Sequence, residues 1–454
     1  MTGDAQPVDI GRLLDAGRWG GYQRFVIALA ALATIFDGVD IQVLGIVIPA
    51  LMKDWGHARS AFAPVIAMGL AGMACGSVVG GIIGDRWGRR RALIGSLLLL
   101  GVLTALCAHA AGLTSLTVLR FLAGFGFGGA LPNASALASE YVPARYRPFA
   151  VTFIIACFPL GASLAGFVSA QLLLTQGWPV LFTIGGVAAV AIAVLLAILL
   201  PESPRYLARH PGRWPELVGV LARMRRPIAA SSAFVDRSEP AVSRTSVRAL
   251  LAPDFRRDTL LLWSAFFTCL FAVYLAFNWM PTMLREAGLG ISLPNLGLSA
   301  FNLGGVAGAV IAALLIQRRG SRIIMLVVAL IAIGGALVMS AMQINATASA
   351  AGILLMLGVT GGAINAVQTT LYALAAHIYP TEVRATGVGA AATIGRGGAI
   401  TSAFAGSAAL GLGGSQAFFA LMAIVMAATA LALAGIGRHV ARPTPLHWTP
   451  RVFE

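Results

Sequence analysis

Long apolar runs constrain this chain more than any other feature of its sequence. About 20 apolar residues are enough to cross a bilayer as a helix, and twelve runs reach that length. They are 24–51, 61–83, 92–111, 114–139, 148–171, 178–200, 258–284, 294–316, 321–342, 350–377, 384–411 and 415–437. The sequence therefore predicts an all-α membrane protein with twelve transmembrane helices.

The predicted spans form two groups of six around one long polar stretch. We expect an N-terminal six-helix bundle over 1–200, a cytoplasmic linker over 201–257, and a C-terminal six-helix bundle with a cytoplasmic tail over 258–454. The two groups also resemble each other, because Gly128-Gly129-Ala130 recurs 233 residues later as Gly361-Gly362-Ala363. Parallel repeats of six spans are typical of secondary transporters, which hold their substrate between the halves.

The distribution of charge predicts how the chain is oriented. Lys and Arg number 32 against 17 Asp and Glu, but charged residues are only 11% of the chain. A nucleic-acid binder carries its charge on a solvated face, and a chain that is 58% hydrophobic has too little polar surface for one. With a cytoplasmic N-terminus, 27 of the 32 cations lie in cytoplasmic segments, as the positive-inside rule requires. We therefore expect no nucleic-acid partner, and a bacterial inner-membrane protein with both termini in the cytoplasm.

Several chemical activities are not indicated. The four cysteines lie singly in apolar runs, without the spacing of a metal site or disulfide framework. The sequence has no Walker loop, HExxH or GxSxG. The GxGxxG string at 124–129 lies inside an apolar span, where close helix packing explains it better than dinucleotide binding. We expect no enzyme, no cofactor and no metal.

Two acidic residues, Asp37 and Asp40, lie deep inside the first span. A charge at the centre of a membrane helix costs about 2.5–3.5 kcal/mol on insertion scales. At positions i and i+3 the two carboxyl groups share one helix face, so they are expected to titrate as a pair. We predict that Asp37 carries the transported proton and that Asp40 acts nearby as a modulator or a ligand. The alternative is a structural pair that locks the first span to the fourth through Arg120.

Two cations, Arg120 and Arg396, lie inside predicted spans and away from the span ends. A guanidinium group can bind a carboxylate with two parallel hydrogen bonds. Arg396, near mid-depth, is predicted to receive the carboxylate of a substrate, with helix bracing as the alternative. Arg120, nearer the outer side, is interpreted as a counter-ion or an entry-side substrate ligand. Further candidates for the substrate site are polar and aromatic residues at plausible depth, namely Asn278, Trp279, Gln368 and Tyr372.

Several motifs resemble a known family. The segment Gly84-Asp85-Arg86-Trp87-Gly88-Arg89-Arg90 and the later Pro201-Glu202-Ser203-Pro204-Arg205 are similar to signatures of the major facilitator superfamily. Asp37-Gly38-Val39-Asp40 and the run from Tyr379 to Gly387 are similar to motifs of its aromatic acid:proton symporters. The resemblance implies a monomer that imports small aromatic carboxylates, of the benzoate or hydroxybenzoate type, together with protons. Alternatives are a symporter for another organic acid or a sugar-like solute, a drug exporter, and a membrane receptor for aromatic acids.

The resemblance also implies a gate at the cytoplasmic side, where Glu140 joins Arg86 or Arg89. Asp85 is predicted to cap a neighbouring helix when this side is closed. In the second half, His377 lies at the place equivalent to that of Glu140, and Arg384 at the place equivalent to that of Arg147. His377 has two interpretations, a role in proton release and complementing a helix end. The predicted gating residues are Asp85, Arg86, Arg89, Glu140, Arg384 and His377.

Overall fold

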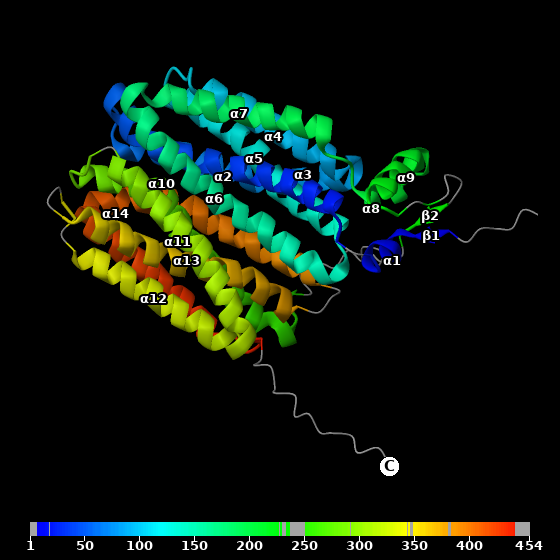
Figure 1. Cartoon of the computed structure of the whole chain (residues 1–454). Coiled ribbons are helices and arrows are strands. Elements are labelled where there is room, and N and C mark those ends of the chain that lie inside the picture. Colours follow the sequence, from blue (N-terminus) through cyan, green and yellow to red (C-terminus); the bar gives the residue numbers. More distant parts are fainter. Residues whose placement is uncertain are drawn as a thin grey trace, which may run out of the picture.

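A computed structural model shows how the predicted spans are arranged. It describes residues 7–17, 19–226, 228, 233–236, 250–290, 292–342, 344–345, 348–379 and 383–440. Two bundles of long helices lie against each other, and a small group of short elements lies at one end of the first bundle (Figure 1). We refer to that end as the linker end and to the opposite end as the far end.

The first bundle contains six long apolar helices. Pro64 and Pro179 lie in the first turns of two of them, where a missing N–H costs no hydrogen bond. The six helices are α2 (Gly21–Trp55), α3 (Ala63–Trp87), α4 (Arg89–Cys107), α5 (Leu113–Tyr141), α6 (Arg147–Thr175) and α7 (Trp178–Leu199). They match the first six predicted spans.

The second bundle contains the remaining spans. Its helices are α10 (Pro253–Glu286), α11 (Ser292–Arg319), α12 (Ser321–Ala341), α13 (Ala350–Ile378) and α14 (Arg384–Gly435). The 52-residue α14 is two helices joined at a kink, because Gly413 and Gly414 have non-helical backbone angles. Gly414 has φ +55° and ψ −135°, a conformation that glycine adopts without a Cβ clash. The kink separates the last two predicted spans, so the twelve-span prediction is confirmed.

The two bundles repeat the same packing. In the first, α3 packs on α5 and α2 on α6; in the second, α11 packs on α13 and α10 on α14. Glycines permit these close approaches: a Cβ on Gly124 would lie 2.1 Å from the Gly69 carbonyl oxygen, and one on Gly304 would lie 1.9 Å from that of Gly358. The glycines at 124–129 therefore serve helix packing, as the sequence indicated.

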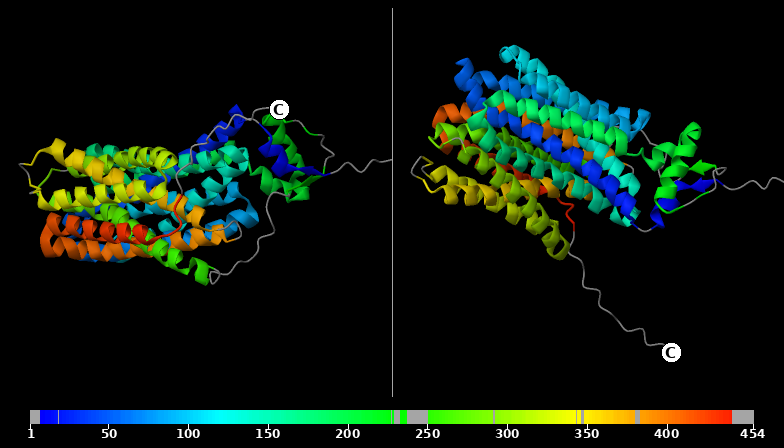
Figure 2. Two further views of the ribbon diagram at one scale, coloured as in Figure 1. Left: turned by 90° about the horizontal axis from the view of Figure 1, so that it is seen from below. Right: turned by 45° about the horizontal axis from the view of Figure 1, so that its top comes forward.

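The short elements at the linker end form a small module that the sequence did not predict. The N-terminal strand β1 (Val8–Asp9) pairs in parallel with β2 (Phe234–Val235) from the linker. In Figures 1 and 2 they lie beside α1 (Ile10–Asp15), α8 (Pro204–Ala208) and α9 (Trp214–Arg223). Short 3-10 turns complete the described elements: η1 (Arg59–Phe62), η2 (Ala144–Tyr146) and η3 (Pro211–Arg213). The apolar side of α1 packs into the module, because Ile10 and Leu14 are fully buried.

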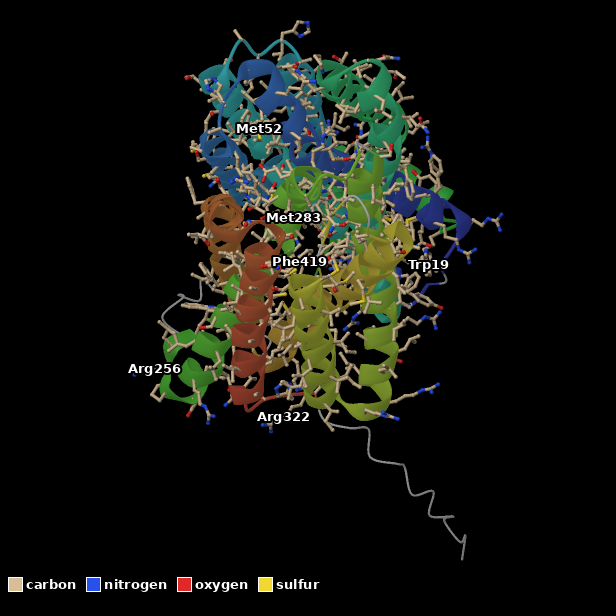
Figure 3. All side chains as sticks on the ribbon, turned by 90° about the vertical axis from the view of Figure 1, so that its left-hand side faces the viewer. Trp19, Met52, Arg256, Met283, Arg322 and Phe419 are labelled. Carbon is tan, nitrogen blue, oxygen red and sulfur yellow. The ribbon has the colours of Figure 1, made fainter. Side chains whose placement is uncertain are left out.

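The two bundles contact each other mainly away from the linker end. Figure 3 views the molecule from the far end, with the first bundle above the second. The Gln42 side chain donates through Nε2 to the Phe277 carbonyl at 3.1 Å, and its Oε1 accepts from Asn302 Nδ2 at 3.3 Å. The Ser299 hydroxyl donates to the Ser163 carbonyl at 2.9 Å. Between described residues, the side-chain hydrogen bonds and ion pairs that join the bundles lie at mid-depth or nearer the far end. The bundles are therefore closed together at the far end.

Candidate functional site

One of the two aspartates on α2 is held in a buried ion pair. Arg120 of α5 donates through Nη2 to Asp40 Oδ2 at 2.7 Å, and Thr104 of α4 donates through its hydroxyl to Asp40 Oδ1 at 2.6 Å. The side chains of Arg120 and Asp40 are only 5% and 7% exposed. Asp40 thus joins three helices of the first bundle.

This ion pair changes the role expected for Arg120. Its guanidinium carbon lies 5.8 Å from the ring centre of Phe182, and its charge faces Asp40. The structure therefore places Arg120 in an ion pair that braces helices, which agrees with the interpretation as a counter-ion, and its role as a substrate ligand stays a prediction. The depth of Arg120 in its span was readable from the sequence, but the neighbour that its side chain meets was not.

Asp37 lies one turn earlier on α2 in a different environment. It is fully buried, and neither carboxylate oxygen has a hydrogen-bond partner among the described residues. Tyr274 of α10, from the second bundle, is close enough to interact electrostatically with Asp37. Of the two aspartates on α2, Asp37 is therefore the one that lies near the other half of the molecule and has no basic partner among the described residues.

Polar groups from both halves also meet around Tyr274, the neighbour of Asp37. Arg396 of α14 donates through Nη1 to the hydroxyl of Ser77 on α3, and Arg396 interacts electrostatically with both Tyr274 and Tyr372. We name Asp37, Ser77, Tyr274, Tyr372 and Arg396 the mid-depth cluster. It combines an acid and a guanidinium group contributed by different halves.

The sequence predicted three members of this cluster and missed two. Asp37, Arg396 and Tyr372 were expected, whereas Ser77 and Tyr274 were not. A signal for Tyr274 was present, because it precedes Asn278 by one helical turn and so lies on the same face of α10. Ser77 sits among small residues of α3 and gave no such signal.

The other substrate candidates lie in different surroundings. Trp279 is fully buried, and its indole N–H donates to the Ala403 carbonyl at 2.9 Å. It fills the contact between α10 and α14, so its predicted place in the wall of the site is not what the structure shows. Asn278 is 2% exposed and donates to the Tyr274 carbonyl of its own helix at 2.8 Å. Gln368 is half-buried one turn before Tyr372 on α13, on the face that carries the cluster.

The predicted gating residues are partly brought together at the linker end. Arg89 Nη2 lies 2.5 Å from Asp85 Oδ1, and Arg89 Nε donates to Glu140 Oε1 at 3.3 Å. Ser203, which follows α7, donates its hydroxyl to the other oxygen of Glu140. These contacts tie α3, α4 and α5 to the start of the linker.

Glu202, which precedes Ser203 in this network, belongs to the motif at 201–205 but was not predicted as a gating residue. Its Oε1 accepts from the backbone N–H groups of Arg90 at 3.1 Å and Ser203 at 2.9 Å. Burial raises the pKa of Glu202 above its ordinary value, and the two backbone donors oppose that rise. The side chain thus joins the beginning of α4 to the end of α7.

The remaining predicted gating residues stand apart from this network. Arg86 and His377 are exposed. Arg384 donates through Nε to the Tyr379 carbonyl at 3.3 Å, at the linker end of the second bundle. In this arrangement Arg89, rather than Arg86, is the basic partner of Glu140.

Two repeated six-helix halves, with charged groups of both halves at mid-depth between them, define a secondary membrane transporter. The family model of the Major Facilitator Superfamily matches residues 30–403. The chain belongs to that superfamily.

Three relatives that are similar over most of their length are named as transporters of aromatic acids. The chain is 36% identical over 448 residues to a gallate transporter of Pseudomonas putida, covering 98% of both chains. It is 34% identical over 417 residues to the 4-hydroxybenzoate transporter PcaK of Pseudomonas putida, covering 91% of this chain and 92% of the relative. A benzoate transport protein of Acinetobacter baylyi is 28% identical, with 87% and 85% covered.

Solved structures show the same fold. An inward open conformation of the xylose transporter XylE from E. coli matches with a TM-score of 0.73 and 16% identity, covering 92% of this chain and 97% of that one. A partially occluded inward open conformation of XylE matches with a TM-score of 0.72 over 94% of this chain and all of the other. The predicted superfamily and fold class are therefore confirmed.

Proposed function

We propose that this protein is a proton-coupled transporter that imports small aromatic carboxylates across the bacterial inner membrane. Its relatives carry gallate, 4-hydroxybenzoate and benzoate, and these substrates share an aromatic ring and a carboxylate. The excess of arginine at the linker end supports an orientation in which that end and both termini are cytoplasmic. The halves over 1–200 and 258–454 move against each other as a monomer, joined by the linker at 201–257.

The observation that carries the proposal is the position of Asp37. A buried carboxyl group without a hydrogen-bond partner is costly to ionise, so its proton is exchanged only when the surroundings change. The halves move relative to each other during transport, and Tyr274 and Arg396 of the second half are neighbours in the mid-depth cluster. Movement between the halves thus changes the charge environment of Asp37.

Each group of the cluster then has a specific task. Arg396 binds the carboxylate of the substrate, for which it exchanges its present contact with the Ser77 hydroxyl. Tyr274 and Tyr372 supply an aromatic wall with polar hydroxyl groups, as small-molecule sites commonly do. Asp40 and Arg120 hold the first half rigid beside Asp37.

The gating network has its task at the cytoplasmic side. The closed far end supports an inward-facing state for this structure. Asp85, Arg89 and Glu140 lie together at the linker end, and we propose that they rearrange when that side closes. Alternating exposure of the cluster to the two sides follows from this exchange of contacts.

Uptake into membrane vesicles tests the proposal. Labelled 4-hydroxybenzoate is expected to accumulate when a proton gradient is applied and to stop accumulating when an uncoupler is added. Asp37→Asn is expected to lose accumulation but to keep exchange of labelled for unlabelled substrate, because a neutral residue cannot carry the proton. The exposed Asp254→Asn is the matched control and should accumulate like the wild type. Accumulation that ignored the uncoupler, or that survived in Asp37→Asn, would contradict proton coupling.

Arg396 is tested by the same assay. Arg396→Lys keeps the charge but loses the planar fork, and Arg396→Gln loses both. A rising KM from wild type through Lys to Gln, across gallate, benzoate and 4-hydroxybenzoate, is expected. Equal KM values in all three proteins would show that Arg396 only braces α14.

A further inference from the structure

The charged residues of the far end are few, and they lie beside the boundary between the two halves, which we call the seam. In the described loops and helix ends on that side, the charged side chains are Lys53, Asp54, Arg59, Arg285 and Glu286. All five line cavities between the two halves. The outer face therefore presents its charge at the seam through which a substrate must enter.

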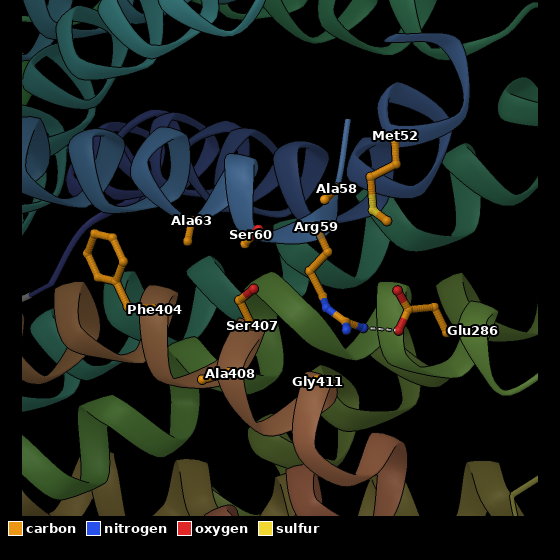
Figure 4. Close-up of a pocket in the computed structure, with 10 residues that line it drawn as sticks. All are labelled: Met52, Ala58, Arg59, Ser60, Ala63, Glu286, Phe404, Ser407, Ala408 and Gly411. Carbon is orange, nitrogen blue, oxygen red and sulfur yellow. Dashed lines mark hydrogen bonds and ion pairs between the residues drawn. The ribbon is translucent and has the colours of Figure 1, made fainter. Parts of the chain in front are cut away.

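The larger of these seam cavities has a volume of about 510 Å³, within the usual range for small-molecule sites. The first half contributes Met52, Ala58, Arg59, Ser60 and Ala63, and the second contributes Glu286, Phe404, Ser407, Ala408 and Gly411. In the view of Figure 4, Ser60 and Ser407 lie between Arg59 and the ring of Phe404. We name this space the outer seam cavity.

Arg59 is the cation of the outer seam cavity. Its Nη1 bonds to Glu286 Oε2 across the seam (Figure 4). Glu286 is the ion-pair partner of Arg59 among the described residues, and its side chain is 38% exposed. Since a guanidinium group has five N–H donors, the Arg59 side chain retains donors for a second carboxylate.

We propose that the outer seam cavity is a binding site for the carboxylate of an incoming aromatic acid, distinct from the mid-depth cluster. This inference rests on the proposed function. Arg59 binds the substrate carboxylate in place of Glu286, and the ring lies along Ser60 and Ser407 toward Phe404, which is 51% exposed. Loss of the Arg59–Glu286 pair removes a tie between the halves, so binding at this site favours opening of the outer side.

The two partners of the ion pair provide the test, because a binding site and a simple latch predict different results. Arg59→Gln removes the ligand for the carboxylate and is expected to raise the KM for 4-hydroxybenzoate uptake by about tenfold, the worth of one charge-assisted hydrogen bond. Glu286→Gln removes the competing carboxylate and is expected to lower that KM by about two- to fivefold. Arg59→Lys should lie between wild type and Arg59→Gln. Lys53→Gln, which removes the same charge from the outer face but not from this cavity, is the matched control for general attraction of anions.

A second measurement reads the cavity directly. Ser60→Cys is introduced together with Cys75→Ser, because Ser60 is an exposed residue of the cavity and Cys75 is the exposed native cysteine among the described residues. A membrane-impermeant thiol reagent is applied from outside with and without 4-hydroxybenzoate. The substrate is expected to slow the reaction, and adding Arg59→Gln is expected to abolish this protection.

The outcomes separate this site from the proposed function. Wild-type protein that fails to take up any aromatic acid overturns both. Wild-type uptake with KM shifts in the same direction for Arg59→Gln and Glu286→Gln overturns the site alone, because a latch loses its function when either partner is removed. The site is also overturned if the substrate still protects the thiol of the Ser60→Cys variant after Arg59 has been replaced by Gln.

Discussion

Replacing Asp40 by asparagine should destabilise the protein far more than the same change at Asp37. The Asp40 carboxylate is 2.7 Å from Arg120 Nη2 in a pair whose side chains are 5% and 7% exposed. Asparagine keeps the shape and can still accept the Thr104 hydroxyl, but Arg120 stays charged because a guanidinium group does not lose its proton in a protein. Removing one partner of a buried ion pair costs about 3–5 kcal/mol, since it leaves the other charge unpaired.

Asp37 provides the matched comparison on the same helix. Its carboxylate oxygens have no hydrogen-bond partner among the described residues, so Asp37→Asn removes no bond and leaves no charge unpaired. We expect this variant to be as stable as the wild type or more stable. The double variant Asp40→Asn/Arg120→Gln should recover much of the loss, because both charges are then absent and the two amides can bond to each other.

Thermal unfolding in detergent measures these differences. The fraction of monodisperse protein is followed after heating for a fixed time, because irreversible unfolding makes the midpoint depend on the heating schedule. The expected order of midpoints is Asp37→Asn at or above wild type, then the double variant, then Asp40→Asn. Equal midpoints for the two single variants, or a double variant less stable than Asp40→Asn, would refute the assignment of Asp40 as a structural tie.

Three further predictions test the packing and the gating network. Gly38→Ala should sharply lower the yield of folded protein, because the Cβ of the new alanine would lie 2.0 Å from the Phe158 carbonyl oxygen. Gly21→Ala should fold normally, because nothing lies within 4 Å of a Cβ at that position. Equal yields of the two variants would contradict the close approach of α2 and α6. Trp279→Phe should lower the free energy of unfolding by about 1–3 kcal/mol, because the hydrogen bond to Ala403 and some packing are lost. The KM for uptake should stay unchanged. A changed KM at unchanged stability would instead place Trp279 in the substrate site. Because the folded-state pKa of Glu202 is raised by burial, its ionisation opposes folding, so stability should fall as the pH rises from the ordinary value of about 4.5 toward the raised one. Glu202→Gln should therefore be more stable than wild type at neutral pH, with the difference vanishing below that ordinary value; a constant difference across a pH series of unfolding midpoints would contradict the role of this carboxyl group.

Much of the site could be predicted because membrane burial makes charge rare. Asp37 and Arg396 stand out in apolar spans, where each charge is costly and needs a reason to be present. The assignment of Trp279 to the substrate site did not match the structure because an aromatic residue carries no such cost. Its depth in the span was correct, but α10 packs on α14 at that position, and the indole ring fills the contact.

The module at the linker end illustrates a second limit of the sequence. Val8 and Phe234 are paired in the two-stranded sheet although 226 residues separate them. The two strands contain only two residues each, which is too short for a periodic signal. Their pairing depends on where the first bundle places the N-terminus and the linker.

The sequence by itself determined the twelve spans, their division into two repeated halves and the small set of charges that matter. The physical reason is that a bilayer fixes the length of a span and penalises every unpaired charge within it. Only the tertiary structure decided which charges are paired. Asp37 and Asp40 are three residues apart on the same helix, but the packing of α4 and α5 brings Thr104 and Arg120 to Asp40 and not to Asp37. Likewise, Arg59 and Glu286 become partners only because the two halves meet at the far end.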